Sequence, residues 1–224
     1  MPEWWTYGLS DFLLFSPRVY YRLFELHNRA LWPAQILTSA LGLAIFYLLL
    51  WPLNRGHRAI PAILGALWIW IAWSFLWERY ATINWASAYM APIFAVEGLS
   101  LIWIGTVRGA LVFAQHRQIY QFIGLAILAV SIFVYPMIAP LTGRSWWAAE
   151  IFGIAPDPTA LATLAVLSLS RSRSRWLVFP IPLLWCAISG ATLWAMGAGD
   201  FLIAPISALA TFAIAVVPNS REPQ

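Results

Sequence analysis

Lysine is absent from this 224-residue chain, so all 13 of its basic residues are arginine. Retinal and pyridoxal phosphate form Schiff bases with a lysine amine, and the chain can therefore carry neither group in that way. Cysteine is nearly absent too, since Cys186 is the only one. An intrachain disulfide, a cysteine-ligated iron–sulfur cluster and a cysteine-ligated structural zinc site all need more than one cysteine, so all three are excluded.

Charge is also scarce. Charged residues make up 10% of the chain and hydrophobic residues 62%, and the mean hydropathy is +0.74. A water-soluble domain carries about 25% charged residues. The chain also has 15 tryptophans and 13 phenylalanines, and tryptophan rings in particular gather where hydrocarbon meets lipid headgroups. The composition predicts an all-α fold, a polytopic transmembrane helical bundle, with the lipid bilayer as its main partner.

Residues 1–31 are expected to form an interfacial amphipathic segment. They lack the basic region and the small-residue cleavage site of a signal peptide, so no cleavable signal is expected. From Ser10 onward, apolar and charged residues alternate at helical spacing, which predicts a helix lying in the plane of the interface. The apolar face is expected to carry Phe12, Phe15, Val19, Leu23, Leu26 and Ala30, and the polar face Arg18, Arg22, Glu25 and Arg29.

Residues 32–217 are expected to form a seven-helix transmembrane domain, followed by a cytoplasmic tail at 218–224. In the first apolar segment, 19 steps of ~1.5 Å give roughly 28 Å, which is about one hydrocarbon thickness. The seven segments are expected at 32–51, 59–77, 88–107, 118–141, 158–170, 176–194 and 201–217.

The fifth segment is too short to cross a bilayer unaided, and two interpretations remain open. In the first, it is half of a broken span whose other half is 146–154, and its N-terminus would then form an ion site inside the membrane. In the second, it is a short, somewhat buried helix with Asp157 as its N-cap and Pro158 in its first turn.

The loops divide into a basic and an acidic set. Positive charge marks the cytoplasmic side of a membrane protein, which places the C-terminus in the cytoplasm and the N-terminal helix outside. This sidedness accounts for the net charge of +4, and no nucleic-acid partner is expected. The basic set holds Arg55, Arg58, Arg108, Arg117, Arg171, Arg173, Arg175 and Arg221 against Glu222, and the other set holds Arg79 and Arg144 against Glu78, Glu150, Asp157 and Asp200.

Glu97 is the candidate functional residue at membrane depth, because it lies near the middle of the third segment, where a charged carboxylate is costly. No arginine is expected at that depth. One hypothesis is that Glu97, with Ser100 one turn on, lies in an ion or substrate pathway and titrates during function. The alternative is a purely structural hydrogen bond between helices.

Two further groups of side chains are candidate sites. Four acidic residues in the outer loops would raise the local concentration of cations: Glu78, Glu150, Asp157 and Asp200. Three tryptophans on one side of the second segment could form an aromatic wall for a stacked ligand or an organic cation, or could serve in helix packing and lipid contact: Trp70, Trp73 and Trp77.

An enzymatic function has little support in the sequence. The stretch 197–200, Gly-Ala-Gly-Asp, is similar to the Gly-x-Gly-Asp motif of intramembrane aspartyl proteases, and Asp157 could share a proton with Asp200. The Tyr-Asp and Pro-Ala-Leu motifs of that family are missing, however, and Asp200 is more simply the N-cap of the seventh segment. No catalytic residue and no metal site is predicted, and the cofactor is unknown.

Two stretches resemble a family of bacterial polytopic integral membrane proteins defined only as a domain of unknown function. One is Trp-Trp-Thr-Tyr at 4–7 with Ser-Asp-Phe-Leu-Leu-Phe-Ser-Pro at 10–17 and Tyr-Tyr-Arg at 20–22, and the other is Gly-Ile-Ala-Pro-Asp-Pro-Thr at 153–159. The resemblance covers nearly the whole chain and implies a location in the bacterial inner membrane. It brings no activity and no site residues.

The function expected from these patterns is a transporter or channel-like protein for a cation, a proton or a small molecule. The alternative is a non-catalytic accessory subunit of a larger membrane complex. Partnership with other membrane subunits and assembly as a homo-oligomer both remain open. A protein that acts only by packing needs no carboxylate inside the membrane, so Glu97 is the residue that separates the two hypotheses.

Overall fold

The computed structural model describes residues 15–51, 56–113 and 118–217. Several predicted features lie outside these ranges: residues 1–14 of the N-terminal segment with their motif, Arg55, Arg117, and the tail 218–224 with Arg221 and Glu222. Within the ranges the fold is all-helical, as predicted. The β-pairing that they contain is two isolated bridges, Phe113 with Ser170 and Phe152 with Ala155.

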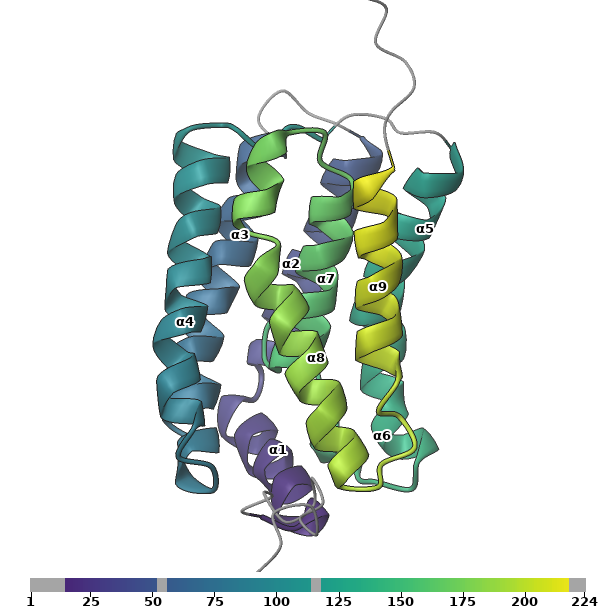
Figure 1. Cartoon of the computed structure of the whole chain (residues 1–224). Helices are drawn as coiled ribbons and strands as arrows, with labels where there is room; N and C mark the ends of the chain where they lie inside the picture. Colours follow the sequence, from purple (N-terminus) through teal and green to yellow (C-terminus); the bar gives the residue numbers. More distant parts are fainter. Residues whose placement is uncertain (1–14, 52–55, 114–117, 218–224) are drawn as a thin grey trace, which may run out of the picture.

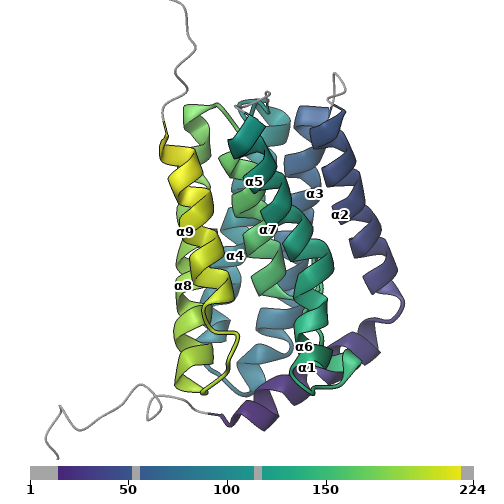
Figure 2. The same ribbon diagram turned by 90° about the vertical axis from the view of Figure 1, so that its right-hand side faces the viewer.

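The helices follow the predicted apolar segments closely. Seven of them, α2, α3, α4, α5, α7, α8 and α9, run side by side, and α1 crosses one end of the bundle (Figures 1 and 2). The main helices are α1 (Pro17–Leu31), α2 (Ala34–Leu50), α3 (Gly56–Ile71), α4 (Ser87–Ser100), α5 (Gln118–Ala129), α6 (Ile138–Leu141), α7 (Pro156–Ser168), α8 (Pro180–Ala195) and α9 (Ile203–Val216). Short π and 3-10 segments extend or join them: η3 (Ala72–Trp77), η4 (Tyr80–Thr82), η5 (Leu101–Val107), η6 (Val130–Val134), η7 (Tyr135–Met137), η8 (Trp146–Ala148) and η9 (Arg173–Leu177).

Seven membrane spans are not supported by the lengths of these helices. Among the described residues, three continuous helices are long and apolar enough to cross a bilayer: Gly56–Thr82, Ser87–Val107 and Ile119–Leu141. A fourth span is counted only if α1 and α2, which meet at 92°, are taken together. Helices α8 and α9 have 16 and 14 residues, and 14 residues at ~1.5 Å each reach only about 21 Å.

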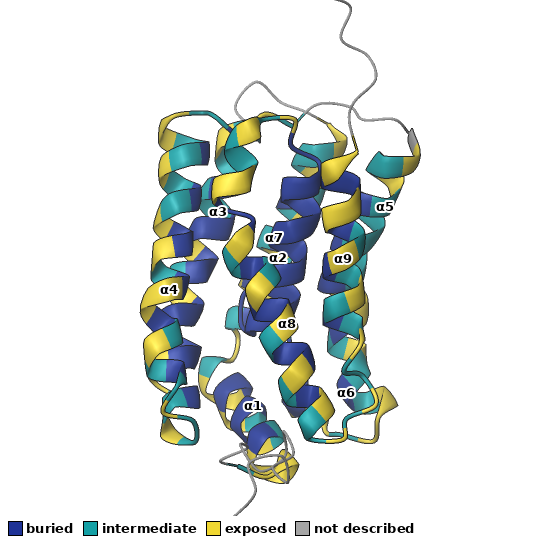
Figure 3. Ribbon diagram, in the orientation of Figure 1, coloured by how far each residue is buried: buried dark blue, intermediate teal, exposed yellow. Residues whose placement is uncertain are grey.

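Helix α7 forms the centre of the bundle, and all 13 of its residues are buried (Figure 3). It packs against α3, α5, α8 and α9. The fifth predicted segment is therefore a buried helix, which agrees with the second of the two interpretations. The predicted cap was wrong, because Ala155 is the N-cap and Pro156 the first residue, while the Asp157 carboxylate bonds to other helices.

Helices α3 and α4 approach closely where two glycines face each other. A Cβ atom on Gly65 would lie 2.5 Å from the carbonyl oxygen of Gly98, and a Cβ on Gly98 would lie 2.5 Å from that of Gly65. Nearer the start of α3, a Cβ on Gly105 would lie 2.3 Å from Pro61. Small residues of this kind allow two helix backbones to pack directly against each other.

The face that α1 buries agrees with the predicted one at Leu23 and differs from it at Val19 and Leu26. Val19 and Leu26, expected on the apolar face, are 43% and 46% exposed, whereas the helix buries Tyr20, Leu23, Phe24, His27 and Asn28. Tertiary contacts decide the orientation. The ring of Phe24 stacks on Phe75 at 4.9 Å, and the Asn28 amide donates to the carbonyls of Trp147 and Ala149, both at 2.8 Å.

Charged residues of the described ranges are distributed unequally between the two ends of the bundle. At the end where α7 and α9 finish, the described charged residues are all arginine: Arg58, Arg108, Arg171, Arg173 and Arg175. At the end that α1 covers, the two signs balance: Arg18, Arg22, Arg29, Arg79 and Arg144 against Glu25, Glu78, Glu150, Asp157 and Asp200.

Candidate functional site

Asp157, in the first turn of α7, is the acceptor for three side chains from two other parts of the bundle, and it is 1% exposed. The Trp185 indole donates to Oδ1 at 2.7 Å, and the Tyr135 hydroxyl donates to Oδ2 at 3.1 Å. The Ser189 hydroxyl also donates to Oδ2. Trp185 and Ser189 are four residues apart on α8 and so share one face. Burial disfavours the charged form of this carboxylate, whereas the three donors and the N-terminal end of the α7 dipole favour it.

A tight turn before α7 places Asp157 in this position. Gly153 has a φ of +75°, a conformation that side chains disfavour, and its N–H donates to the Thr159 hydroxyl at 2.8 Å. The same hydroxyl donates to the Ala155 carbonyl at 2.8 Å. These bonds close the turn over the start of α7 and direct Asp157 towards η7 and α8.

Glu150 is the second buried acid in this part of the bundle, and it is 6% exposed. Its Oε2 atom has no hydrogen-bond partner among the described residues. Burial raises the pKa of Glu150 well above its usual range, the negative charge of Asp157 raises it further, and Arg144 lowers it. Burial and Asp157 therefore favour the protonated form of Glu150, whereas the hydrogen bonds to Asp157 favour its ionised form.

Glu97 lies on the buried stripe of α4 and is fully buried. Both of its carboxylate oxygens lack a hydrogen-bond partner among the described residues, Ser100 included. A cluster of three rings lies between its part of α4 and Asp157, since Phe94 is 4.4 Å from Trp68 and 4.9 Å from Trp185 between ring centroids. The structural alternative requires a hydrogen bond between helices, and in the described part of the chain Glu97 has no partner for such a bond.

The four acids predicted in the outer loops occupy three different environments. Glu150 and Asp157 are buried, Glu78 is exposed, and Asp200 forms an ion pair with Arg144 at 2.8 Å. The N-cap of α9 is Leu202, so the prediction that Asp200 caps this helix was wrong. No hydrogen bond joins Asp200 to Asp157 in the described ranges, and the proton sharing that the protease interpretation requires gains no geometric support.

The three predicted wall tryptophans face outward from the bundle. Trp70, Trp73 and Trp77 are 40%, 61% and 52% exposed, whereas Trp68 is fully buried and donates to the Thr163 hydroxyl at 2.9 Å. Outward-facing tryptophans are suited to contact with lipid. Their role as a wall for a stacked ligand remains a prediction.

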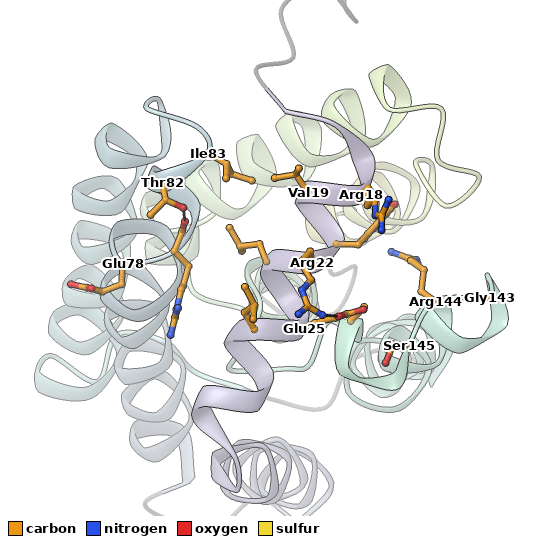
Figure 4. Close-up of a pocket in the computed structure, with 15 residues that line it drawn as sticks. Arg18, Val19, Arg22, Glu25, Glu78, Thr82, Ile83, Gly143, Arg144 and Ser145 are labelled. Carbon is orange, nitrogen blue, oxygen red and sulfur yellow. Dashed lines mark hydrogen bonds and ion pairs between the residues drawn. The ribbon is translucent and has the colours of Figure 1, made fainter.

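A groove of about 920 Å³ surrounds the exposed face of α1 (Figure 4). It is lined by α1, by residues near η4 and by the turn that follows α6. Charged residues of both signs line it: Arg18, Arg22, Arg79 and Arg144 with Glu25 and Glu78. Arg22 pairs with Glu25 at 2.5 Å, and Arg144 lies 4.0 Å above the ring of Tyr21. The groove is an open, charged surface that is distinct from the buried acids.

His27 should make the stability of the protein depend on pH. Burial, followed by the charge of Arg79, lowers the pKa of this side chain to about 4 from an ordinary value near 6.5. Between these values the unfolded chain binds more protons than the folded one, so stability should fall as the pH drops from 6.5 to 4, by up to roughly 3 kcal/mol. Thermal unfolding at a series of pH values should show a shallower decrease for His27→Gln than for the native protein. Equal slopes would contradict this prediction.

Comparison with known proteins identifies a family. The model of a family of unknown function, DUF6064, matches residues 17–222. The chain belongs to this family. No curated protein and no solved structure matches the chain. The match extends from the first residue of α1 to beyond α9, so both buried acidic positions and Glu97 lie within the family's domain.

The described side chains at these positions do not form a set of metal ligands. Across the described ranges, no group of three or more histidine, cysteine, aspartate or glutamate side chains is placed to hold a metal ion.

The sequence pointed to Asp157 and Glu150 as candidate site residues but not to Tyr135, Trp185 and Ser189, which are 22 to 32 residues from Asp157. A Trp-x-x-x-Ser spacing in an apolar helix was the signal available, and it does not point to a partner.

Proposed function

We propose that this member of the DUF6064 family is an integral membrane transport protein of the bacterial inner membrane that takes up and releases a proton at Asp157. The observation that carries the proposal is the buried Asp157 carboxylate, which accepts hydrogen bonds from three side chains inside an apolar bundle, near the end that α1 covers. An ionisable group in such a place is costly and is usually retained for function.

A membrane location is supported by the surface and by the charges. Large apolar side chains are exposed on most sides of the bundle, including Leu99, Trp103, Phe122, Leu184 and Leu209. The end at which all described charged residues are arginine would face the cytoplasm by the positive-inside rule. The C-terminus would then lie inside, and α1 would lie across the outer end, in the plane of the interface.

The proton is favoured over other cations by the chemistry of the two buried acids. The charge of Asp157 acts on Glu150, and two acids that influence each other in this way bind protons as a pair. A metal cation would need further oxygen ligands, and the described acidic, histidine and cysteine side chains do not gather into such a set. Glu97, beyond the aromatic cluster, would be a second proton-binding position.

A role as an accessory subunit is the second candidate, and the lengths of α8 and α9 favour it. These helices are apolar but too short to cross a bilayer alone, and they expose Leu184, Trp194, Ile206 and Leu209. Neighbouring subunits would cover such a surface.

Proton uptake by liposomes containing the purified protein tests the proposal. An imposed pH difference and a trapped pH-sensitive dye should report uptake above that of empty liposomes, and Glu97→Gln should reduce the rate by about tenfold if this group exchanges its proton during transport. Uptake equal to that of empty liposomes would sink the proposal. Recovery of a stoichiometric larger complex by native mass spectrometry would then make the accessory subunit the working hypothesis.

A further inference from the structure

A small cavity lies directly against two of the groups that bond to Asp157. Its volume is about 30 Å³. A cavity holds a water molecule when about 10–15 Å³ is open to the centre of a water-sized probe and two to four polar groups are within reach. The cavity meets both conditions, because its volume exceeds this minimum and its lining includes several hydroxyl and amide groups. It is bounded by Tyr20, Tyr80, Asn84, Met90, Trp185, Ile188, Ser189 and Thr192.

The position of the cavity connects Asp157 with the end of the bundle that α1 covers. Tyr20 on α1 lines the cavity, and the adjacent Tyr21 lines the groove around that helix. Trp185 and Ser189 also line the cavity, and both donate hydrogen bonds to Asp157. The Ser189 hydroxyl uses its proton in the bond to Asp157, so its oxygen is available to accept a hydrogen bond from a water.

We infer that this cavity holds water and is the route by which protons from the α1 end reach Asp157. The inference rests on the proposed function, since it specifies how the same site is reached. In each transfer of a proton to Asp157, the Ser189 hydroxyl gives its proton to Asp157 Oδ2, and its oxygen takes a proton from the cavity water. That water regains a proton from the α1 end, so no atom or charge is left over.

Besides Trp185 and Ser189, several titratable groups interact with Asp157 from the surrounding elements. Tyr135 approaches from η7, Glu150 from the turn before α7, and Cys186 from α8. Tyr20 approaches from α1 and is influenced by the charges of both acids. Asp200, paired with Arg144, acts from further away. Tyr20 also lines the cavity, as do the two α8 donors to Asp157, Trp185 and Ser189.

Hydrogen exchange of two indole N–H groups tests this inference without any transport assay. Trp185 lines the cavity, and Trp68 is fully buried against Thr163 away from it. By NMR of the native protein in nanodiscs, the indole proton of Trp185 should exchange with D₂O at least about tenfold faster than that of Trp68. Equal, slow exchange at both positions would overturn the inference.

Filling the cavity supplies the second half of the test. Thr192→Leu should slow Trp185 exchange by about tenfold and leave Trp68 unchanged, because the added side chain displaces water. Ala191→Leu, on the exposed face of the same helix, should change neither. If Thr192→Leu does not fold, Ile188→Phe fills the cavity from one turn away. Unchanged Trp185 exchange in a folded filling variant would overturn the inference.

The two proposals fail in different ways. Fast, cavity-dependent exchange at Trp185 without proton uptake by liposomes would sink the proposed function and keep the water route. Proton uptake with slow exchange at Trp185, or uptake that survives the filling of the cavity by Thr192→Leu, would sink the water route and keep the proposed function.

Discussion

Asp157→Asn is expected to abolish proton uptake while the protein keeps its fold. An asparagine cannot take up a proton near neutral pH, but its carbonyl oxygen accepts two hydrogen bonds, and its amide can donate to the Ser189 or Tyr135 hydroxyl after that hydroxyl rotates. The number of hydrogen bonds at position 157 can therefore stay the same in this variant. Uptake in liposomes should fall to the level of empty vesicles, and the unfolding temperature should stay close to that of the native protein.

Asp157→Ala separates the functional from the structural contribution of the same residue. The alanine leaves three buried donors, from Tyr135, Trp185 and Ser189, without an acceptor. Each buried group that loses its partner costs about 1–3 kcal/mol, so the loss of stability should be at least about 3 kcal/mol. Retention of native proton uptake by a folded Asp157→Asn variant would rule out a proton-binding role for this carboxylate. A large loss of stability in that variant would contradict the hydrogen-bonding argument.

Gly98→Ala is expected to cause one of the largest losses of stability among single substitutions in this chain. Its Cβ atom would lie 2.5 Å from the Gly65 carbonyl oxygen and 2.7 Å from a side-chain carbon of Ile69. Neither the backbone of α3 nor a packed side chain can move away easily, so α3 and α4 would have to separate. Overpacking usually costs 1–3 kcal/mol, and a contact with backbone places the expected loss at about 3 kcal/mol or above.

Gly199→Ala provides the matched control for this prediction. A Cβ atom on Gly199 would meet nothing within 4 Å, and the residue has no positive φ. Thermal unfolding in detergent should therefore show a decrease of roughly 6–12 °C for Gly98→Ala, and no measurable change for Gly199→Ala. A Gly98→Ala variant as stable as the control would show that α3 and α4 pack less closely than the structure indicates.

The helices were predictable because each apolar segment carries its own boundaries in the sequence. Trp32 and Trp51 bracket a segment whose helix spans Ala34–Leu50, and the third segment, expected at 88–107, is observed at Ser87–Val107. The number of spans was not predictable in this way. An apolar composition indicates that a helix is surrounded by apolar groups, but it does not tell whether these belong to lipid or to other helices. Helix α7 is apolar, and all of its residues are buried by the protein itself.

The chemistry of the buried acids could be predicted only in part. Burial of Glu97 followed from its apolar neighbours along one helix. The surroundings of Asp157 did not follow, because its partners lie 22 to 32 residues away and meet it only through the packing of α5 and α8 on α7. The orientation of α1 was mispredicted for the same reason, since Asn28 bonds to a loop more than 100 residues later.

The complete enclosure of α7 constrains the order in which the chain can be assembled. Helices α8 and α9, which cover α7, are synthesised after it. Until they arrive, the Asp157 carboxylate has no bond from Trp185 or Ser189, and the apolar sides of α7 have no protein to cover them. The part of the chain that precedes α8 is therefore an incomplete folding unit, and the last two helices complete the core rather than extend it.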